Sequence, residues 1–179
     1  MTQIKQLIRE IIPVIIGILI ALFINNWNED RKDKMYLDKI FLSIENELND
    51  SATEIKSVMP KQIASVDTLD VYLNNQQVTL YEIMIRSNGI QMPTIKTNSW
   101  NAIANSKIEL IEYDKLSALS EIAERKENLI QRIEKQMDYI FQNFENTDRN
   151  KKIIVRMMIM DVVNTENELL NKIEELIGK

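Results

Sequence analysis

Residues 11–24 read IIPVIIGILIALFI, an apolar run without a charged or strongly polar side chain, and this run limits what the chain can fold into. By length alone it suits a buried core helix or a signal-peptide core as well as a membrane span, which needs about 20 residues. The flanks favour a span, because Arg9 can reach lipid headgroups and Trp27 lies where an interfacial aromatic residue is common. As a helix, residues 7–28 cover about 33 Å, enough to cross a bilayer. We therefore predict an N-terminal tail and transmembrane anchor over residues 1–28.

A cleaved signal peptide is the main alternative to a permanent anchor. Signal peptides end in a small-residue cleavage site of the A-x-A type, whereas this run ends in F-I-N-N-W-N. We therefore expect the segment to be retained as a signal anchor that crosses the lipid bilayer once.

One face of the predicted span carries small or polar residues. At about 100° per residue, the side chains that gather on it are Glu10, Pro13, Gly17, Ala21 and Asn28, with Asn25 at the margin. The Gly17 and Ala21 spacing lets two helix backbones approach closely, which predicts a homo-oligomer or association with another membrane protein. Alternatively, small residues are simply common in spans and Glu10 is shallow enough to be hydrated. Both interpretations remain open.

Residues 10–29, EIIPVIIGILIALFINNWNE, resemble the N-terminal signature of a large family of small bacterial membrane proteins of unknown function. That signature has the form G-E-I-x-L-V-x-I-G-I-L-I-A-L-x-I-N-N-W-N-E. This chain matches it at Glu10, Ile11, Val14, 16–22 and 24–29. It departs from the signature at Arg9, Pro13 and Phe23, and the basic N-terminal extension of the family is almost absent here. Beyond the anchor the similarity is weak. The resemblance implies an anchor in the inner (cytoplasmic) membrane followed by a helical domain, and it brings no catalytic activity.

The orientation of the span rests on two opposing signals. The basic residues that count are Lys5 and Arg9 before the span and Arg31, Lys32, Lys34 and Lys39 after it. Their distribution favours a cytoplasmic C-terminal domain, although acidic residues are interleaved and long domains cross membranes largely regardless of charge. The basic N-terminus that is usual in the resembled family implies the opposite orientation. We predict an extracytoplasmic C-terminal domain.

Residues 29–179 are predicted to form one acidic helical domain. The chain has only three Gly and three Pro, too few for the turns and bulges that sheets require. Its formal net charge is -5 and it has no basic stripe, so nucleic acid is a poor candidate partner. The expected fold is all-α, with a single N-terminal transmembrane helix followed by an antiparallel bundle of three long helices and short helical inserts.

Three apolar seams with alternating steps of three and four residues predict the long helices. The first contains Leu37, Phe41, Ile44, Leu48, Ile55 and Val58, and we expect Pro60 to end or kink that helix. The second, which Asp114 is expected to cap, contains Leu116, Leu119, Ala123, Lys126, Ile130, Ile133, Met137, Ile140 and Phe144. Its polar member, Lys126, either sets the register of packing or extends to solvent. The third spans residues 151–177 and contains Ile154, Met158, Leu169, Ile173 and Leu176.

Two shorter segments lie between the first and second long helices. Thr79 and Glu82 have the spacing of a capping box, which predicts a short helix ending near Gly89 in the left-handed conformation. Residues 90–98 contain a proline and show no helical period. We predict an irregular connector there, and the loop most suited to a functional role.

The chain contains no His and no Cys, which excludes Ser-His-Asp and Cys-His catalysis, Cys/His zinc sites and disulfides. The paired acids Glu45/Glu47, Glu166/Glu168 and Glu174/Glu175 are expected on solvated, salt-bridged faces. We therefore predict no enzymatic activity, no cofactor and no metal. The favoured function is a membrane-anchored helical scaffold or interaction protein. The alternative is a membrane-tethered sensor that binds a small ligand in the bundle or at residues 90–98, without its own output domain.

Overall fold

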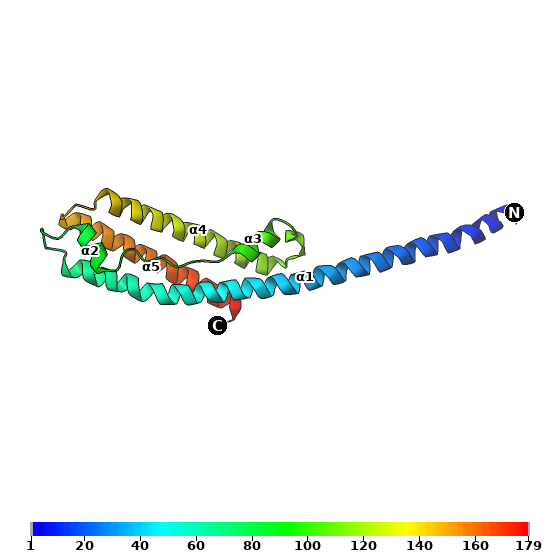
Figure 1. Ribbon diagram of the computed structural model, residues 1–179. Helices are drawn as coiled ribbons and strands as arrows, with labels where there is room; N and C mark the ends of the chain where they lie inside the picture. Colours follow the sequence, from blue (N-terminus) through cyan, green and yellow to red (C-terminus); the bar gives the residue numbers. More distant parts are fainter. Residues whose placement is uncertain (1, 179) are drawn as a thin grey trace. The chain divides into compact units, whose positions relative to one another are not determined.

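A computed structural model describes the backbone of residues 2–178 and the side chains of residues 11–178. Within this range the chain is helical, with short connections and no strand. The elements are α1 (Thr2–Val71), α2 (Leu80–Arg86), α3 (Asn98–Ala104), the 3-10 helix η1 (Ile108–Leu110), α4 (Tyr113–Gln142) and α5 (Arg149–Ile177) (Figure 1). The predicted all-α fold, with a long apolar helix at the N-terminus, is confirmed.

The chain divides into two compact units, residues 1–42 and 43–179. The first unit is the N-terminal part of α1. Among the described residues, α1 is the one helix that is long and apolar enough to cross a membrane, judged by length and composition. All side chains from Ile11 to Ile24 are exposed within the protein. The predicted end of the anchor at residue 28 lies within this unit and stays a prediction.

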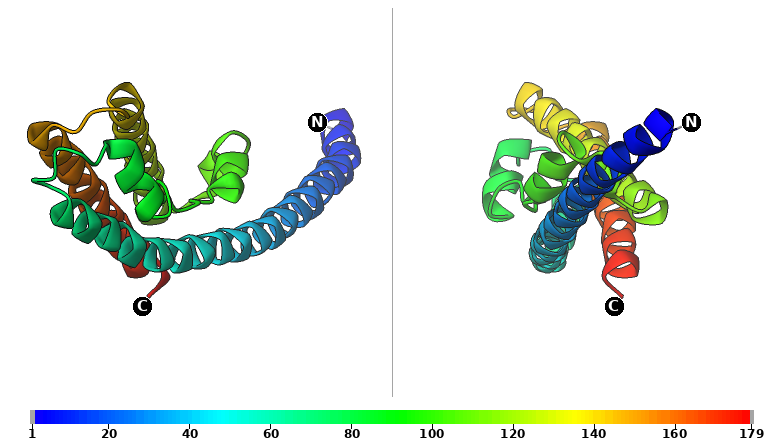
Figure 2. Two further views of the ribbon diagram at one scale, coloured as in Figure 1. Left: turned by 60° about the vertical axis from the view of Figure 1, so that its left-hand side comes forward. Right: turned by 90° about the vertical axis from the view of Figure 1, so that its right-hand side faces the viewer.

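The second unit is a bundle of three long helical segments, namely residues 43–71 of α1 together with α4 and α5 (Figure 2). Ion pairs join them: Lys56–Glu174 and Asp70–Arg156 between α1 and α5, and Glu121–Lys172, Arg125–Glu168 and Arg132–Asp161 between α4 and α5. In both sets the residue number rises on one helix as it falls on the other. Helix α5 is therefore antiparallel to both of its partners, and the predicted antiparallel bundle is confirmed.

The buried face of α1 follows a regular heptad spacing. Its members are Ile44, Leu48, Ser51, Ile55, Val58, Gln62, Ser65 and Leu69. Each fully buried Ile, Leu or Val contributes roughly 1.5–3 kcal/mol relative to an exposed one, so this face holds the helix in the bundle. The prediction that Pro60 ends the helix is wrong, because α1 continues to Val71. Pro60 is exposed, so the backbone carbonyl that loses its helical hydrogen bond to this residue can be hydrated.

The buried face of α4 differs from the predicted seam at every second position. Its buried residues are Leu119, Ile122, Leu129, Ile133, Gln136 and Ile140, with half-buried Lys126 on the same line. Ala123, Ile130 and Met137 lie half-buried at the edge. The predicted seam has one polar residue, Lys126, whereas the observed buried face has two, Lys126 and Gln136. Hydrophobicity alone therefore favours the predicted seam over the face that is buried. Asp114 lies in the first turn but Glu112 is the N-cap residue, which corrects the predicted cap.

The buried face of α5 contains two charged residues. Its heptad members are Lys152, Val155, Ile159, Val162, Glu166, Leu169 and Ile173. The predicted seam omits both charges and uses Ile154, which is 38% exposed, so this part of the prediction is wrong. The observed spacing of three and four residues is regular once Lys152 and Glu166 are included.

The short helix α2 is held by caps at both ends. The predicted capping box is confirmed: Thr79 accepts a hydrogen bond from the backbone N–H of Glu82, whose carboxylate accepts one from the N–H of Thr79. At the other end, Asn88 and not Gly89 takes the first left-handed position, with φ of 60°. The backbone N–H of Gly89 then donates to the carbonyl of Met84 over 2.8 Å, which completes a Schellman-type end.

Buried Lys152 closes the C-terminal end of α1. Its Nζ atom donates hydrogen bonds to the backbone carbonyls of Tyr72, over 3.1 Å, and Asn75, over 2.6 Å. Carbonyls at a helix end lack intrahelical partners and carry partial negative charge, so an ammonium group satisfies both requirements. Burial lowers the pKa of Lys152. The charged residue thus fixes where α1 stops and the connection to α2 begins.

Replacing Lys152 by Met tests this cap. The Lys152→Met variant keeps most of the buried hydrocarbon but leaves the Asn75 carbonyl without its Lys152 donor and the Tyr72 carbonyl with only the Asn75 N–H, so we expect it to lower the free energy of unfolding by about 1–2 kcal/mol. Chemical denaturation of the full chain in detergent micelles, followed by helical circular dichroism, measures the loss. The exposed Lys135→Met variant on α4 is the matched control. An equal effect of the two substitutions would contradict the capping role of Lys152.

Candidate functional site

The connector between α2 and α3 lies along the bundle and is tied to it by polar contacts. The backbone N–H of Lys96 donates to Ser51 Oγ over 2.9 Å, and Lys126 Nζ donates to Thr97 Oγ1 over 3.0 Å. Nearer to α2, Gln62 Nε2 donates to the backbone carbonyl of Gln91 over 3.0 Å. Residues 87–97 therefore form the irregular connector that the sequence predicts at 90–98. The Lys126 side chain binds this connector to α4 and does not extend to solvent.

The strongest polar feature inside the bundle is the pair formed by Gln62 of α1 and Glu166 of α5. Gln62 Nε2 donates to Glu166 Oε1 over 2.8 Å. Glu166 is fully buried and Gln62 is 4% exposed. The other side-chain oxygen of each residue, Gln62 Oε1 and Glu166 Oε2, is buried without a hydrogen-bond partner. The prediction that Glu166 lies on a solvated face is therefore wrong, because position 166 belongs to the buried heptad of α5.

Burial governs the protonation of Glu166. Removal of the carboxyl from water raises its pKa to about 7, and the hydrogen bond from Gln62 opposes this rise only in part. Among the side chains of residues 11–178, burial and the Gln62 hydrogen bond are the causes of this pKa shift, and two basic side chains of α4 and α5 bind other acids. Arg125 pairs with Glu121 and Glu168, and Lys172 pairs with Glu121 and Glu175. Glu166 is therefore a carboxyl group that titrates near neutral pH in the core of the bundle.

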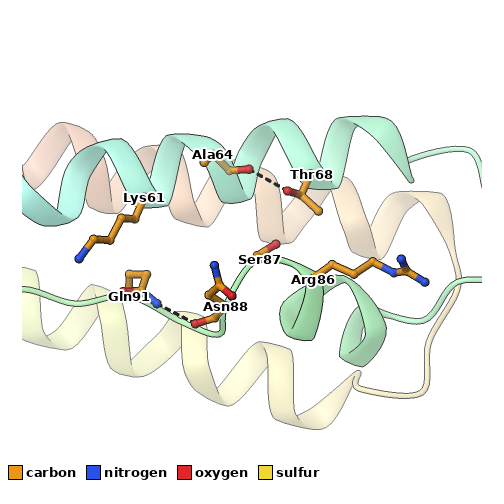
Figure 3. A pocket seen from close by; sticks show the side chains of 7 residues that line it. All are labelled: Lys61, Ala64, Thr68, Arg86, Ser87, Asn88 and Gln91. Atoms are coloured by element: carbon orange, nitrogen blue, oxygen red, sulfur yellow. Dashed lines mark hydrogen bonds between the residues drawn. The ribbon is translucent and has the colours of Figure 1, made fainter.

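A surface pocket of about 370 Å³ lies over the connector (Figure 3). Its lining residues are Lys61, Ala64, Thr68, Arg86, Ser87, Asn88 and Gln91. The two charged members, Lys61 and Arg86, are both basic and lie toward opposite ends of the pocket in Figure 3. The Arg86 guanidinium stacks over the ring of Tyr72, 5.1 Å from its centroid. An opening of this size with basic and amide groups suits a small anionic molecule.

Gln91 joins the surface pocket to the buried pair. Its side chain lines the pocket and donates to the Asn88 carbonyl over 2.7 Å, while its backbone carbonyl accepts from Gln62. A second, smaller pocket of about 10 Å³ has a lining that includes Gln62, Gln91 and Gln136. A cavity of that size holds about one water molecule. A displacement of Gln91 at the surface would therefore act directly on the hydrogen bonds of Gln62.

The predicted helix-packing face lies in the other unit. Gly17 and Ala21 are exposed, and a Cβ atom added at Gly17 would meet nothing within 4 Å. Asn25 Nδ2 donates to Glu29 Oε1 over 3.1 Å within the same helix. The Trp27 ring lies under the Arg31 guanidinium at 5.8 Å. Asn28 is half-buried and Pro13 is exposed. The side chains of Arg9 and Glu10 lie outside the described residues.

The predicted first seam leaves out Gln62, and Glu166 is predicted on a solvated face, because polar and charged side chains are usually exposed. The signal that identifies them is the heptad spacing itself, which continues through both positions without a break. Among the side chains of residues 11–178, no three acidic groups gather in a way that could hold a metal ion.

A double-mutant cycle tests the coupling between Gln62 and Glu166. Gln62→Leu leaves Glu166 and the Gln91 carbonyl without their donor, so we expect the free energy of unfolding near pH 7 to fall by about 1–3 kcal/mol. The double variant Gln62→Leu/Glu166→Leu removes the buried acid and should recover part of that loss, giving a coupling energy of at least about 1 kcal/mol. Exposed Gln131→Leu on α4 serves as the control. Strictly additive effects would show that the two residues do not act as a pair.

The 179-residue sequence can be compared with family models, curated proteins and solved structures. None of the three comparisons gave a match.

Proposed function

We propose that this protein is a membrane-anchored helical scaffold or interaction protein. The observation that carries the proposal is the exposure of every side chain from Ile11 to Ile24. A helical surface of this length made of Ile, Leu, Val and Phe is unfavourable in water, and lipid is the environment that matches it. The anchor leaves the second unit, with its separate core, free to bind partners at the membrane.

The proposal places the interaction in the span at the face that contains Gly17 and Ala21. Open space around Gly17 and the small side chain of Ala21 would let a second helix approach closely. Asn28, at one end of the same face, can donate or accept a hydrogen bond across such a contact. The partner is a second copy of the chain or another membrane protein.

The location and orientation are part of the same proposal. The resemblance of residues 10–29 to a signature of bacterial membrane proteins supports a single-pass anchor in the inner membrane. It also supports a cytoplasmic N-terminus and an extracytoplasmic bundle, because a basic N-terminus is usual in that family.

Chemical cross-linking in native membranes tests both parts. We expect a membrane-permeant, amine-reactive cross-linker to give a discrete oligomer or partner band, and the Gly17→Leu/Ala21→Leu variant to lose most of it because Leu side chains keep the backbones apart. An impermeant reagent applied to intact spheroplasts should give the same band if the lysines of the bundle lie outside the cytoplasm.

The matched control is Ile12→Leu/Ile16→Leu, which adds two leucines to the opposite side of the helix. If the band is unchanged in the Gly17→Leu/Ala21→Leu variant, the proposed face is wrong. If only the permeant reagent gives a band, the bundle faces the cytoplasm.

A second candidate function, a membrane-tethered ligand-binding module, is favoured by the pocket at Lys61 and Arg86. Its two cations and amide groups suit a small carboxylate or phosphate compound, and Gln91 connects the pocket to the buried Gln62 and Glu166 pair. A ligand that moves the connector would thereby change the packing between α1 and α5.

Thermal-shift measurements on the full chain in micelles test this second candidate. A panel of small carboxylates and phosphates at millimolar concentration should contain a compound that raises the Tm, because a ligand bound to the folded state stabilises it by mass action. The Lys61→Gln/Arg86→Gln variant should lose the shift, and Lys135→Gln, at an exposed position on α4, should keep it. A flat response across the panel would argue against a ligand pocket.

A further inference from the structure

We infer that Glu166 is a neutral carboxylic acid which donates from Oε2 to Gln62 Oε1, and that this proton holds α1, α5 and the connector together. The inference concerns the bundle alone and does not depend on how the protein contacts membrane partners.

The count of donors and acceptors carries the argument. The amide nitrogen of Gln62 has two hydrogens, and both are used, one on the Gln91 carbonyl and one on Glu166 Oε1. Two acceptors, Gln62 Oε1 and Glu166 Oε2, are then left buried without a donor. If Glu166 is ionised, neither acceptor has a donor among the described side chains, so the loss of hydration at both oxygens is not compensated by the protein.

One proton removes both deficits. Placed on Oε2, it turns that atom into a donor, and the orphan acceptor Gln62 Oε1 belongs to the same amide group that already donates to Glu166 Oε1. An amide and a carboxylic acid then form a cyclic pair with two hydrogen bonds, N–H to Oε1 and O–H to the amide oxygen. The pair is uncharged, so it can remain in the core without a counter-ion.

Charged groups on the surrounding elements are committed elsewhere. On α1, Lys56 pairs with Glu174, and in the connector Lys96 pairs with Asp50. On α4, Lys126 donates to Thr97, and Arg125 pairs with Glu121 and Glu168. On α5, Lys172 pairs with Glu121 and Glu175. Lys61 is exposed and Arg86 stacks on Tyr72 at the surface. The effect of burial on the Glu166 carboxyl, whose pKa rises to about 7, agrees with a neutral acid.

Loss of the proton would release the connector. The ionised carboxylate repels Gln62 Oε1 and favours water, so α1 and α5 separate locally and Gln62 no longer holds the Gln91 carbonyl. The folded-state pKa, about 7, lies above the ordinary value of 4.5, so the folded state binds more protons between these values. The contact is therefore strongest at low pH, weakens as pH rises through this window, and changes no further above it.

Infrared spectroscopy of the full chain in micelles tests the protonation. We expect the carbonyl-stretch band of a protonated carboxylic acid at about pH 6, where free carboxyls are ionised, and its loss with a midpoint near 7. Carbon-13 labelling of the Glu carboxyls should shift this band, which identifies it as Glu without any substitution. The band should be missing in Glu166→Gln and present in Glu168→Gln, a control at an exposed position of α5. A wild-type spectrum without the band would overturn the inference.

Hydrogen exchange of residues 87–97 tests the release. After correction for the intrinsic exchange rate, protection in the wild type should fall by up to about tenfold for each pH unit between about 4.5 and 7. Glu166→Gln replaces the acidic O–H by an amide N–H that does not titrate, so its protection should be independent of pH while the connector stays bound. Protection that varies with pH in the same way in both proteins would overturn the role of Glu166.

Discussion

The structure of the bundle depends on burying one heptad face from each of three antiparallel helical segments. Steps of three and four residues continue without interruption from Ile44 to Leu69, from Leu119 to Ile140 and from Lys152 to Ile173. Because the spacing of a helix is fixed, a polar residue that occurs at a heptad position is carried into the core with its apolar neighbours. Each such residue then requires a partner, and the partners determine where the connector and the helix ends lie.

The polar residues of the heptads connect the helices to the irregular segments. Ser51 Oγ accepts a hydrogen bond from the backbone N–H of Lys96, and Lys126 Nζ donates one to Thr97 Oγ1. Gln62 Nε2 donates a hydrogen bond to the backbone carbonyl of Gln91. Lys152 in the same way closes the end of α1. A connector with few apolar residues cannot be held by the hydrophobic effect alone, so these hydrogen bonds position the surface pocket and the smaller pocket lined by Gln62 and Gln91.

The sequence predicts those features that depend on local spacing and misses those that depend on tertiary partners. The all-α class, the capping box at Thr79 and the irregular connector follow from short-range pattern and are confirmed. The end of α1 is misplaced, because a proline on the exposed face of a packed helix is tolerated. Glu166 is placed on the wrong face, because a charged residue is assumed to be solvated. Its heptad position carries it into the core, where its partner Gln62 is distant in sequence and cannot be recognised from spacing.

Lys152 and Glu166 are charged residues at heptad positions of α5, and only the contact of Glu166 depends on whether its side chain is protonated. Two heptads apart on α5, both are fully buried and both carry an ionisable group. The Lys152 ammonium reaches two carbonyls at the end of α1, so its charged form is satisfied and contributes to the fold. Glu166 receives a single hydrogen bond from a neutral amide and has no counter-ion, so its charged form has an unsatisfied oxygen. Protonation therefore decides the contact at Glu166, whereas at Lys152 burial lowers the pKa of an ammonium group whose charged form is held by two carbonyl acceptors.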